Sequence, residues 1–206
     1  MAKVLVTGAT GYVGKRLIMY LLNQGHEIYA LCYIKGVRVF EEDKKNLSYI
    51  WGDLRNPETL QSLPQDIEAA YYLVHSMSEV VSDREDEELQ VVKNFIEGIK
   101  KTRIQQIIYL GGIINDEKTL SQKLQSRLSV EEALKGSGLP TTILRAGIII
   151  GAGSAAFSST SMDEEEEETF QRLCLCRQPK AMGTCKCGCL VFMTREEWHA
   201  KKEAGV

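Results

Sequence analysis

A glycine-rich segment near the amino terminus constrains this chain more than any other feature. Residues 4–14 have the sequence VLVTGATGYVG, in which an apolar run leads into glycines at every third position. Gly8 permits a tight turn after a strand, Gly11 lets the backbone approach a pyrophosphate, and Gly14 lets a helix pack against the strand. The sequence therefore predicts a strand at residues 3–6, a phosphate-binding turn and a helix.

The same segment supplies the first candidate binding residues. Amide groups at the start of the expected helix would face the phosphates. An ordinary strand, turn and helix without a ligand is the alternative, and the buried-strand and helical patterns on either side favour the binding loop. The candidate cofactor-binding residues here are Gly8, Thr10, Gly11, Tyr12, Val13 and Gly14.

The length and charge of the chain limit what it can be. Its 206 residues suffice for one domain with a substantial core, and its formal net charge of -3 disfavours nucleic acid and anionic membrane surfaces as partners. The chain enters its first strand without an apolar signal segment, and it contains no apolar run long enough to span a bilayer. We therefore expect a cytoplasmic protein.

Strand and helix patterns alternate along the first three quarters of the chain. Such alternation predicts a doubly wound parallel α/β sheet with the strand order 3-2-1-4-5-6. The first helix is expected to end near Gly25, and a short helix is expected to start near Pro57. The expected strands are residues 3–6, 27–32, 46–51, 69–74, 105–110 and 140–147, and the expected longer helices after the first are residues 82–103 and 120–134.

The spacing Thr-Gly-x-x-Gly-x-x-Gly at Thr7 to Gly14 resembles the short-chain dehydrogenase/reductase superfamily, in its extended and atypical branches. The resemblance covers roughly residues 2–157 and implies an NAD(P)-binding Rossmann domain over residues 1–157. It also implies that Asn94 is a structural asparagine, although a solvated side chain is equally consistent with the sequence.

The residues after the second strand bear on the type of cofactor. An NAD site usually has an acidic residue there to bind the ribose hydroxyls, whereas a 2′-phosphate prefers basic neighbours. Residues 33–38 contain no acid and two cations, Lys35 and Arg38, so the sequence favours NADP over NAD. Members of the superfamily often have an arginine where Tyr33 stands, so Lys35 or Arg38 would have to reach in; alternatively, both are solvated loop cations.

The resemblance places further cofactor contacts at later strand ends. Asp53 would accept a hydrogen bond from the adenine amine and Leu54 would cover the ring, unless Asp53 merely caps the turn before Pro57. The backbone at His75 and Ser76 would pass beneath the ribose on the nicotinamide side. His75 has a near-neutral ordinary pKa, but no partner for it is apparent in the sequence, so a backbone role is favoured over acid–base catalysis.

The usual catalytic set of the superfamily is missing. The serine position after the fifth strand contains glycine, in the sequence Tyr109-Leu110-Gly111-Gly112, and no Tyr-x-x-x-Lys occurs. If Glu131 is the acid that follows the motif lysine, Arg127 takes the lysine position and Lys123 the tyrosine position. Arg127 would hold ribose or phosphate, since a guanidinium is a poor acid or base, and Lys123 would act only with a strongly lowered pKa.

This pattern resembles the NmrA-like and nucleoside-diphosphate-sugar-epimerase-like members of the superfamily. Many of these bind NADP and act as reductases, redox sensors or assembly factors without the tyrosine. Two functions are therefore open: an NADPH-dependent reductase or epimerase acting on a small organic substrate, and a non-enzymatic NADP(H)-sensing or interaction module. The missing catalytic residues favour the second of these, and a homo-oligomer is compatible with either.

The composition changes abruptly after residue 157. An acidic run at residues 163–168 is typical of a solvated linker, and five of the six cysteines follow it. Residues 158–206 are expected to be an irregular tail that replaces the substrate-binding lobe of the superfamily. Free thiols are favoured there over a zinc site, because two or more residues usually separate paired zinc ligands, whereas one residue separates each pair here. The candidate ligands are Cys174, Cys176, Cys185 and Cys187.

Overall fold

A computed structural model describes residues 1–75, 84–113, 121–146 and 149. At residues 84, 85 and 123 it describes the backbone alone. The chain divides into a compact unit, Met1–Leu144, and a second unit, Arg145–Val206. The expected boundary at residues 157 and 158, the tail and its four candidate zinc ligands lie outside the described residues.

The described elements follow the predicted order of strands and helices. Strands β1 and β2 have the predicted bounds, β4 ends two residues earlier than expected, and β5 extends two residues further. Gly25 follows the first helix with a φ of 80°, which fits its predicted place at the helix end. The elements are β1 (Lys3–Val6), α1 (Tyr12–Asn23), β2 (Glu27–Cys32), β3 (Leu47–Trp51), η1 (Pro57–Ser62), β4 (Ala69–Tyr72), α2 (Arg84–Ile99), β5 (Gln106–Gly112), α3 (Gln122–Lys135) and β6 (Thr141–Ala146).

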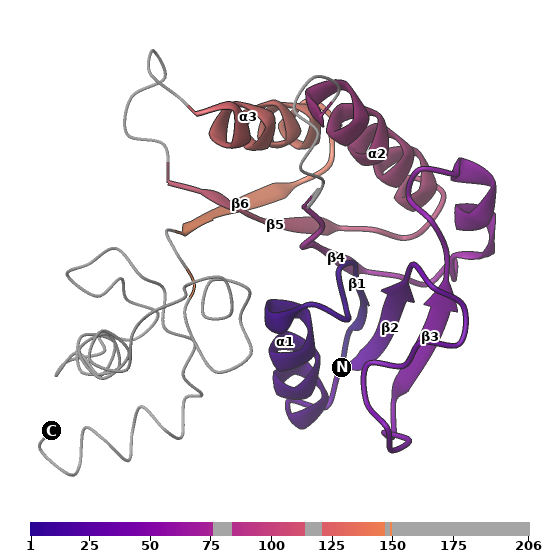
Figure 1. Ribbon diagram of the computed structural model, residues 1–206. Helices are drawn as coiled ribbons and strands as arrows, with labels where there is room; N and C mark the ends of the chain where they lie inside the picture. Colours follow the sequence, from indigo (N-terminus) through magenta and orange to yellow (C-terminus); the bar gives the residue numbers. More distant parts are fainter. Residues whose placement is uncertain (76–83, 114–120, 147–148, 150–206) are drawn as a thin grey trace, which may run out of the picture. The chain divides into compact units, whose positions relative to one another are not determined.

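The strands form one sheet in the order β3-β2-β1-β4-β5-β6, which confirms the predicted doubly wound topology (Figure 1). The pairs β1–β2, β2–β3, β1–β4 and β4–β5 are all parallel. Strand order reverses at β1, which has β2 on one side and β4 on the other. In open α/β sheets such a reversal leaves a crevice at the carboxyl ends of the strands, where ligands bind.

Two apolar clusters hold the helices against opposite faces of the sheet. Helix α1 covers one face, where Ile18 and Leu21 pack on Val4, Val6 and Ile28. Helices α2 and α3 cover the other face together with η1 (Figure 1). The side chains fully buried on that face include Phe95, Ile99, Ile107, Tyr109 and Leu134. The central strands β1, β2, β4 and β5 are therefore largely buried, whereas β3 and β6 at the sides of the sheet are more exposed.

Candidate functional site

The glycine loop has the geometry that its sequence predicted. Gly8 has a φ of 65°, and a Cβ atom there would lie 2.8 Å from the carbonyl oxygen of Leu73. A Cβ at Gly14 would lie 2.3 Å from the carbonyl oxygen of Gly8, closer than two such atoms can approach. The turn is closed by the Gly11 amide, which donates to the Gly8 carbonyl at 3.0 Å. Only glycine fits at Gly8 and Gly14 with this backbone.

The start of α1 is open to an anion. Gly11 is the N-cap residue, no side chain caps the helix, and its first turn contains no acidic residue. Thr10 is exposed, while Tyr12 and Val13 are half-buried in the first turn. The Arg16 guanidinium carbon lies 3.8 Å from the centre of the Tyr12 ring, which adds a positive charge close to this helix end. Unpaired helix amides and a nearby cation together favour phosphate binding.

Thr7 fixes the loop to the neighbouring strand. Its hydroxyl donates to the Tyr71 carbonyl at 3.1 Å and accepts from the Leu73 amide at 3.2 Å. The Thr7 amide also donates to the Tyr71 carbonyl, at 3.0 Å. Because Thr7 is fully buried, these bonds anchor the glycine loop at the point where the strand order reverses.

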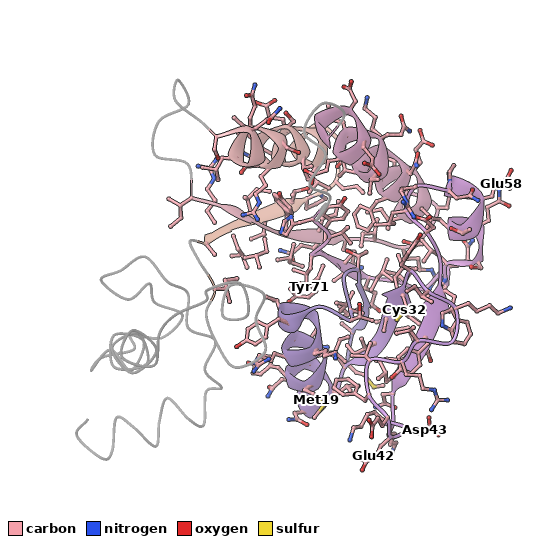
Figure 2. The ribbon with its side chains drawn as sticks, viewed as in Figure 1. Met19, Cys32, Glu42, Asp43, Glu58 and Tyr71 are labelled. Atoms are coloured by element: carbon pink, nitrogen blue, oxygen red, sulfur yellow. The ribbon has the colours of Figure 1, made fainter. Side chains whose placement is uncertain are left out.

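The two cations expected to select NADP have different surroundings. Lys35 is exposed in the turn that follows β2. Arg38 donates from Nη1 to Asp43 at 2.8 Å, and its guanidinium carbon lies 5.9 Å from the centre of the Tyr49 ring. Figure 2 shows Asp43 well below Cys32, toward the ends at which the strands begin. The contact with Asp43 therefore draws Arg38 away from the carboxyl edge.

A third cation, Arg55, lies beside Tyr33, the residue that follows β2. Its guanidinium donates to the hydroxyl of Tyr33 and lies 4.8 Å from the centre of the Tyr33 ring. Its Nη2 also donates to Asp53 Oδ2 at 3.0 Å. The sequence does contain this arginine two residues after Asp53, in the loop that follows β3, and that position was the signal that could have indicated it. Its contact with Tyr33 spans 22 positions of the sequence and is set by the sheet.

The Asp53 carboxylate accepts hydrogen bonds from Arg55, and its side chain is 28% exposed. Its Oδ1 accepts from the Arg55 amide at 2.9 Å and from Arg55 Nε at 3.1 Å. Burial alone would raise the pKa of Asp53, but the hydrogen bonds and the charge of Arg55 outweigh it and hold this pKa below its ordinary value. Asp53 is therefore ionised at neutral pH, and it makes the turn contact that was the alternative to adenine recognition. Its role toward adenine stays a prediction.

Leu54 and Asn94 form the base of the same loop. The Leu54 side chain is buried in the apolar cluster beneath α2, so it exposes little surface to a ligand, and its contact with the adenine stays a prediction. Asn94 is 5% exposed, and its Nδ2 donates to the carbonyl oxygens of Leu54 at 2.9 Å and Arg55 at 3.4 Å. The structural role that the resemblance implied for Asn94 agrees with these contacts.

His75 lies near Tyr109, Arg127 and the backbone of Leu110, which the sequence alone did not indicate. Its ring centre lies 6.1 Å from that of Tyr109, in an edge-to-face arrangement. Burial and the charge of Arg127 lower the pKa of His75 to about 4, although a hydrogen bond with the backbone of Leu110 acts in the opposite direction. His75 is therefore neutral at physiological pH and available as a hydrogen-bonding group at the end of β4.

Arg127 packs beside Gly112, the last residue of β5. A Cβ added at Gly112 would lie 2.7 Å from a methyl group of Leu124 and 3.3 Å from Arg127 Nη1. The backbone carbonyl of Arg127 accepts a 3.4 Å hydrogen bond from the Tyr109 hydroxyl. Lys123 lies in the first turn of α3, and its side chain is outside the described residues, as is Ser76.

The described part of the chain contains neither a cluster of metal-ligating side chains nor a helix that could span a membrane. Across residues 1–75, 84–113, 121–146 and 149, no three His, Cys, Asp or Glu side chains come together as a metal site. Among the helices that lie in these ranges, none is both long and apolar enough to cross a membrane.

Comparison with known families agrees with this geometry. Residues 1–182 match the model of the NmrA-like family. The photosystem II assembly factor Ycf39 of Cyanophora paradoxa is 30% identical over 144 residues, which cover 69% of this chain and 44% of that protein. The NmrA-like family domain-containing oxidoreductase flvB of Aspergillus flavus is 28% identical, over 72% of this chain and 48% of its own. The chain thus spans about half the length of these curated relatives.

A solved structure supports the same fold. The enzyme WbmH of Bordetella bronchiseptica, crystallised in complex with NAD+, superposes with a TM-score of 0.60 at 20% identity. The match covers 73% of this chain and 57% of that chain. At this identity the likeness shows the shared Rossmann fold.

Proposed function

Because the chain belongs to the NmrA-like family, we propose that it binds NADP(H) at the carboxyl edge of its sheet. Its NAD(P)-binding fold is that of the atypical short-chain dehydrogenases and reductases. The observation that carries the proposal is the glycine loop, where the backbone of Gly8 and Gly14 leaves no space for a Cβ atom. Such close backbone approach, followed by an uncapped helix, suits a pyrophosphate.

The preference for NADP over NAD rests on charge at the end of β2. Residues 33–38 contain no carboxylate that would bind the two ribose hydroxyls of NAD. Glu27, the acid of β2, lies at the opposite end of the strand, where it pairs with Lys3 at 3.5 Å. A 2′-phosphate carries close to two negative charges, so it is favoured beside cations and disfavoured beside an acid.

The reaction we propose is NADPH-dependent reduction of a small organic substrate, with epimerisation as the related possibility. The bound nicotinamide would supply the hydride, and the protein would supply orientation and charge. Arg127 would hold a polar or anionic group of the substrate or ribose, since its guanidinium keeps its proton. His75, neutral beside Arg127, would donate or accept one hydrogen bond at the same edge, and Lys123 would complete this set from the first turn of α3.

A second function is supported by the packing around Gly112. Leu124 and Arg127 crowd the space beside Gly112 at the end of β5, and the chain has no Tyr-x-x-x-Lys. These features favour a protein that binds NADP(H) without turning it over and that presents the bound state to a partner. The two functions share the same cofactor site and differ in whether NADPH is consumed.

Calorimetric titration tests the shared site. We expect the purified chain to bind NADPH more tightly than NADH. We expect Gly11→Trp to abolish the binding of both nucleotides, because the indole would cover the start of α1. Gln24→Trp is the matched control, because it adds the same bulk to an exposed residue at the other end of the helix. Failure of the unmodified chain to bind either nucleotide would contradict the proposed function.

Turnover separates the two functions. Consumption of NADPH in the presence of a panel of carbonyl and quinone compounds would support the reductase, and binding without consumption would support the sensor. If turnover is found, we expect the joint substitution Lys123→Ala and Arg127→Ala to reduce it. Unchanged turnover in that double variant would exclude the roles proposed for both residues.

A further inference from the structure

The ends of β2 and β3 bring three polar residues into one cluster. Arg55 donates from Nη2 to the Tyr33 hydroxyl and to Asp53 Oδ2, and from Nε to both oxygens of Asp53. The Arg55 side chain is nevertheless 51% exposed, and Tyr33 is 62% exposed. This cluster of Tyr33, Asp53 and Arg55 thus holds a cation in a fixed position that a ligand in solvent can reach.

The register of the sheet places the cluster at the edge where the glycine loop lies. Cys32 and Trp51, the last residues of β2 and β3, are paired in the parallel register. The Gly52 amide then donates to the Cys32 carbonyl at 3.0 Å, which continues the pairing by one residue. Because β2 lies between β1 and β3, Tyr33 leaves the sheet one strand away from Gly8, and Arg55 follows the strand beyond it.

The backbone that carries Arg55 is held from two sides. Asn94 of α2 donates to the carbonyl oxygens of Leu54 and Arg55. The Thr59 hydroxyl accepts from the Asp53 amide at 2.9 Å. With its backbone anchored and its side chain stacked on Tyr33, Arg55 loses little further conformational entropy when it binds a ligand.

We propose that Arg55 is the residue that binds the adenosine 2′-phosphate of NADP(H), and that Tyr33 and Asp53 position its guanidinium; this inference rests on the proposed function. The hydrogen bonds from the guanidinium to described residues use Nε and Nη2, and the side chain is half exposed, so Nη1 would be the group that donates to a phosphate oxygen. A guanidinium matches phosphate geometry better than an ammonium does. Tyr33, which stands in the place of the expected arginine, thus supports an arginine supplied from the next loop.

The other two cations fit this role less well. Arg38 is paired with Asp43, and that pair lies toward the beginning of β3. Lys35 is exposed and carries a point charge on a flexible stem, which offers less directional recognition of a phosphate. We therefore expect both to contribute less to NADP selectivity than Arg55.

Calorimetry with NADPH and NADH on three matched variants tests the assignment. Arg55→Gln is expected to weaken NADPH binding by about 10- to 100-fold, as for the loss of a charge-assisted hydrogen bond, while NADH binding changes less than about twofold. Arg38→Gln and Lys35→Gln are expected to leave the ratio of the two affinities nearly unchanged. Retained NADH binding shows in the same experiment that each variant is folded.

Substitutions of Tyr33 test its positioning role. Tyr33→Phe keeps the ring beneath the guanidinium and should retain most of the NADPH preference, whereas Tyr33→Ala should lose most of it. A merely structural role for Tyr33 would weaken NADPH and NADH equally and would overturn this part of the proposal.

The outcomes distinguish this inference from the proposed function. If the unmodified chain binds neither nucleotide, the proposed function and this inference both fail. If the chain binds NADPH and the affinity ratio survives Arg55→Gln, or falls instead in Arg38→Gln or Lys35→Gln, only the assignment of Arg55 is overturned.

Discussion

Asn94 offers a direct test of how the adenine-side loop is held. Its buried amide donates to the Leu54 carbonyl at 2.9 Å and accepts from Gln90 Nε2 at 2.9 Å. Asn94→Ala removes these two bonds and the longer bond to the Arg55 carbonyl, and it leaves the Leu54 carbonyl without this donor. A buried unsatisfied carbonyl costs about 1–3 kcal/mol, and the lost part-buried bond to Gln90 adds about 0.5–1 kcal/mol. We therefore expect the free energy of unfolding to fall by about 1.5–4 kcal/mol.

Urea unfolding followed by circular dichroism measures this loss, and thermal unfolding should show a midpoint lowered by about 3–16 °C. Gln90→Ala is the matched control, because it removes only the bond to Asn94 Oδ1 from an exposed position on the same helix. We expect that control to cost less than about 1 kcal/mol. Equal losses in the two variants would refute the reasoning that the buried bond to Leu54 holds the loop.

Asn94→Asp separates the effect of the hydrogen bond from that of shape. The new carboxylate at position 94 would place an oxygen against the Leu54 carbonyl, so at pH 8 this variant should be less stable than Asn94→Ala. Burial and the facing carbonyls would raise the folded-state pKa of the new carboxyl above its unfolded value of about 3.9. Its contribution to stability is then present at low pH and lost as pH rises, so the deficit should shrink on acidification. A deficit independent of pH would contradict this account.

Three further predictions concern other parts of the fold. The folded-state pKa of His75 is lowered to about 4, so the free energy of unfolding should fall as pH drops from about 6.5 toward 4. His75→Gln should flatten this pH dependence in urea titrations. An unchanged slope would exclude His75 as its source. The hydrogen bond from Lys3 lowers the pKa of Asp66, so this pair should stabilise the fold above about pH 4 and lose its effect as pH falls. Lys3→Met should remove this loss of stability in acid in the same assay. If the loss remained in Lys3→Met, the pair would not be its cause. Gly14→Ala should lower the free energy of unfolding more than Gly36→Ala does. A Cβ atom at Gly14 would lie 2.3 Å from a backbone oxygen, whereas a Cβ atom at Gly36 would contact nothing and only the φ of 86° is unfavourable there. Thermal unfolding midpoints in the opposite order would contradict the packing argument.

The order of the elements was predictable because each was encoded locally. The apolar runs at β1 and β2 gave the correct strand bounds, and the alternation of strands and helices gave the correct sheet order. The bounds of β4 and β5 differed by two residues at their carboxyl ends. Strand ends depend on whether a neighbouring strand continues the hydrogen-bond ladder, and hydropathy does not report this.

The candidate site was predicted less evenly than the fold. The roles of Gly8 and Gly14 follow from steric limits that any such turn imposes, so the sequence indicated them correctly. Lys35 and Arg38 were selected by their nearness to β2 in the sequence, and their roles stay predictions. The approach of Arg55 to Tyr33 crosses between strands, so the sequence did not indicate it. Asp53 was expected to face a ligand, and its pairing with Arg55 became visible only in three dimensions.

The sequence alone determined the Rossmann topology, the glycine loop and the absence of the usual Ser, Tyr and Lys catalytic set. These features depend on residue type and short-range spacing, which are complete in the sequence. The tertiary structure decided which cation stands at the end of β2, that Asn94 supports the loop from 40 positions away, and that His75 lies beside Tyr109 and is kept neutral by burial and Arg127. Those features depend on how parallel strands bring distant loops to one edge, and electrostatic and hydrogen-bond energies are set by that distance in space.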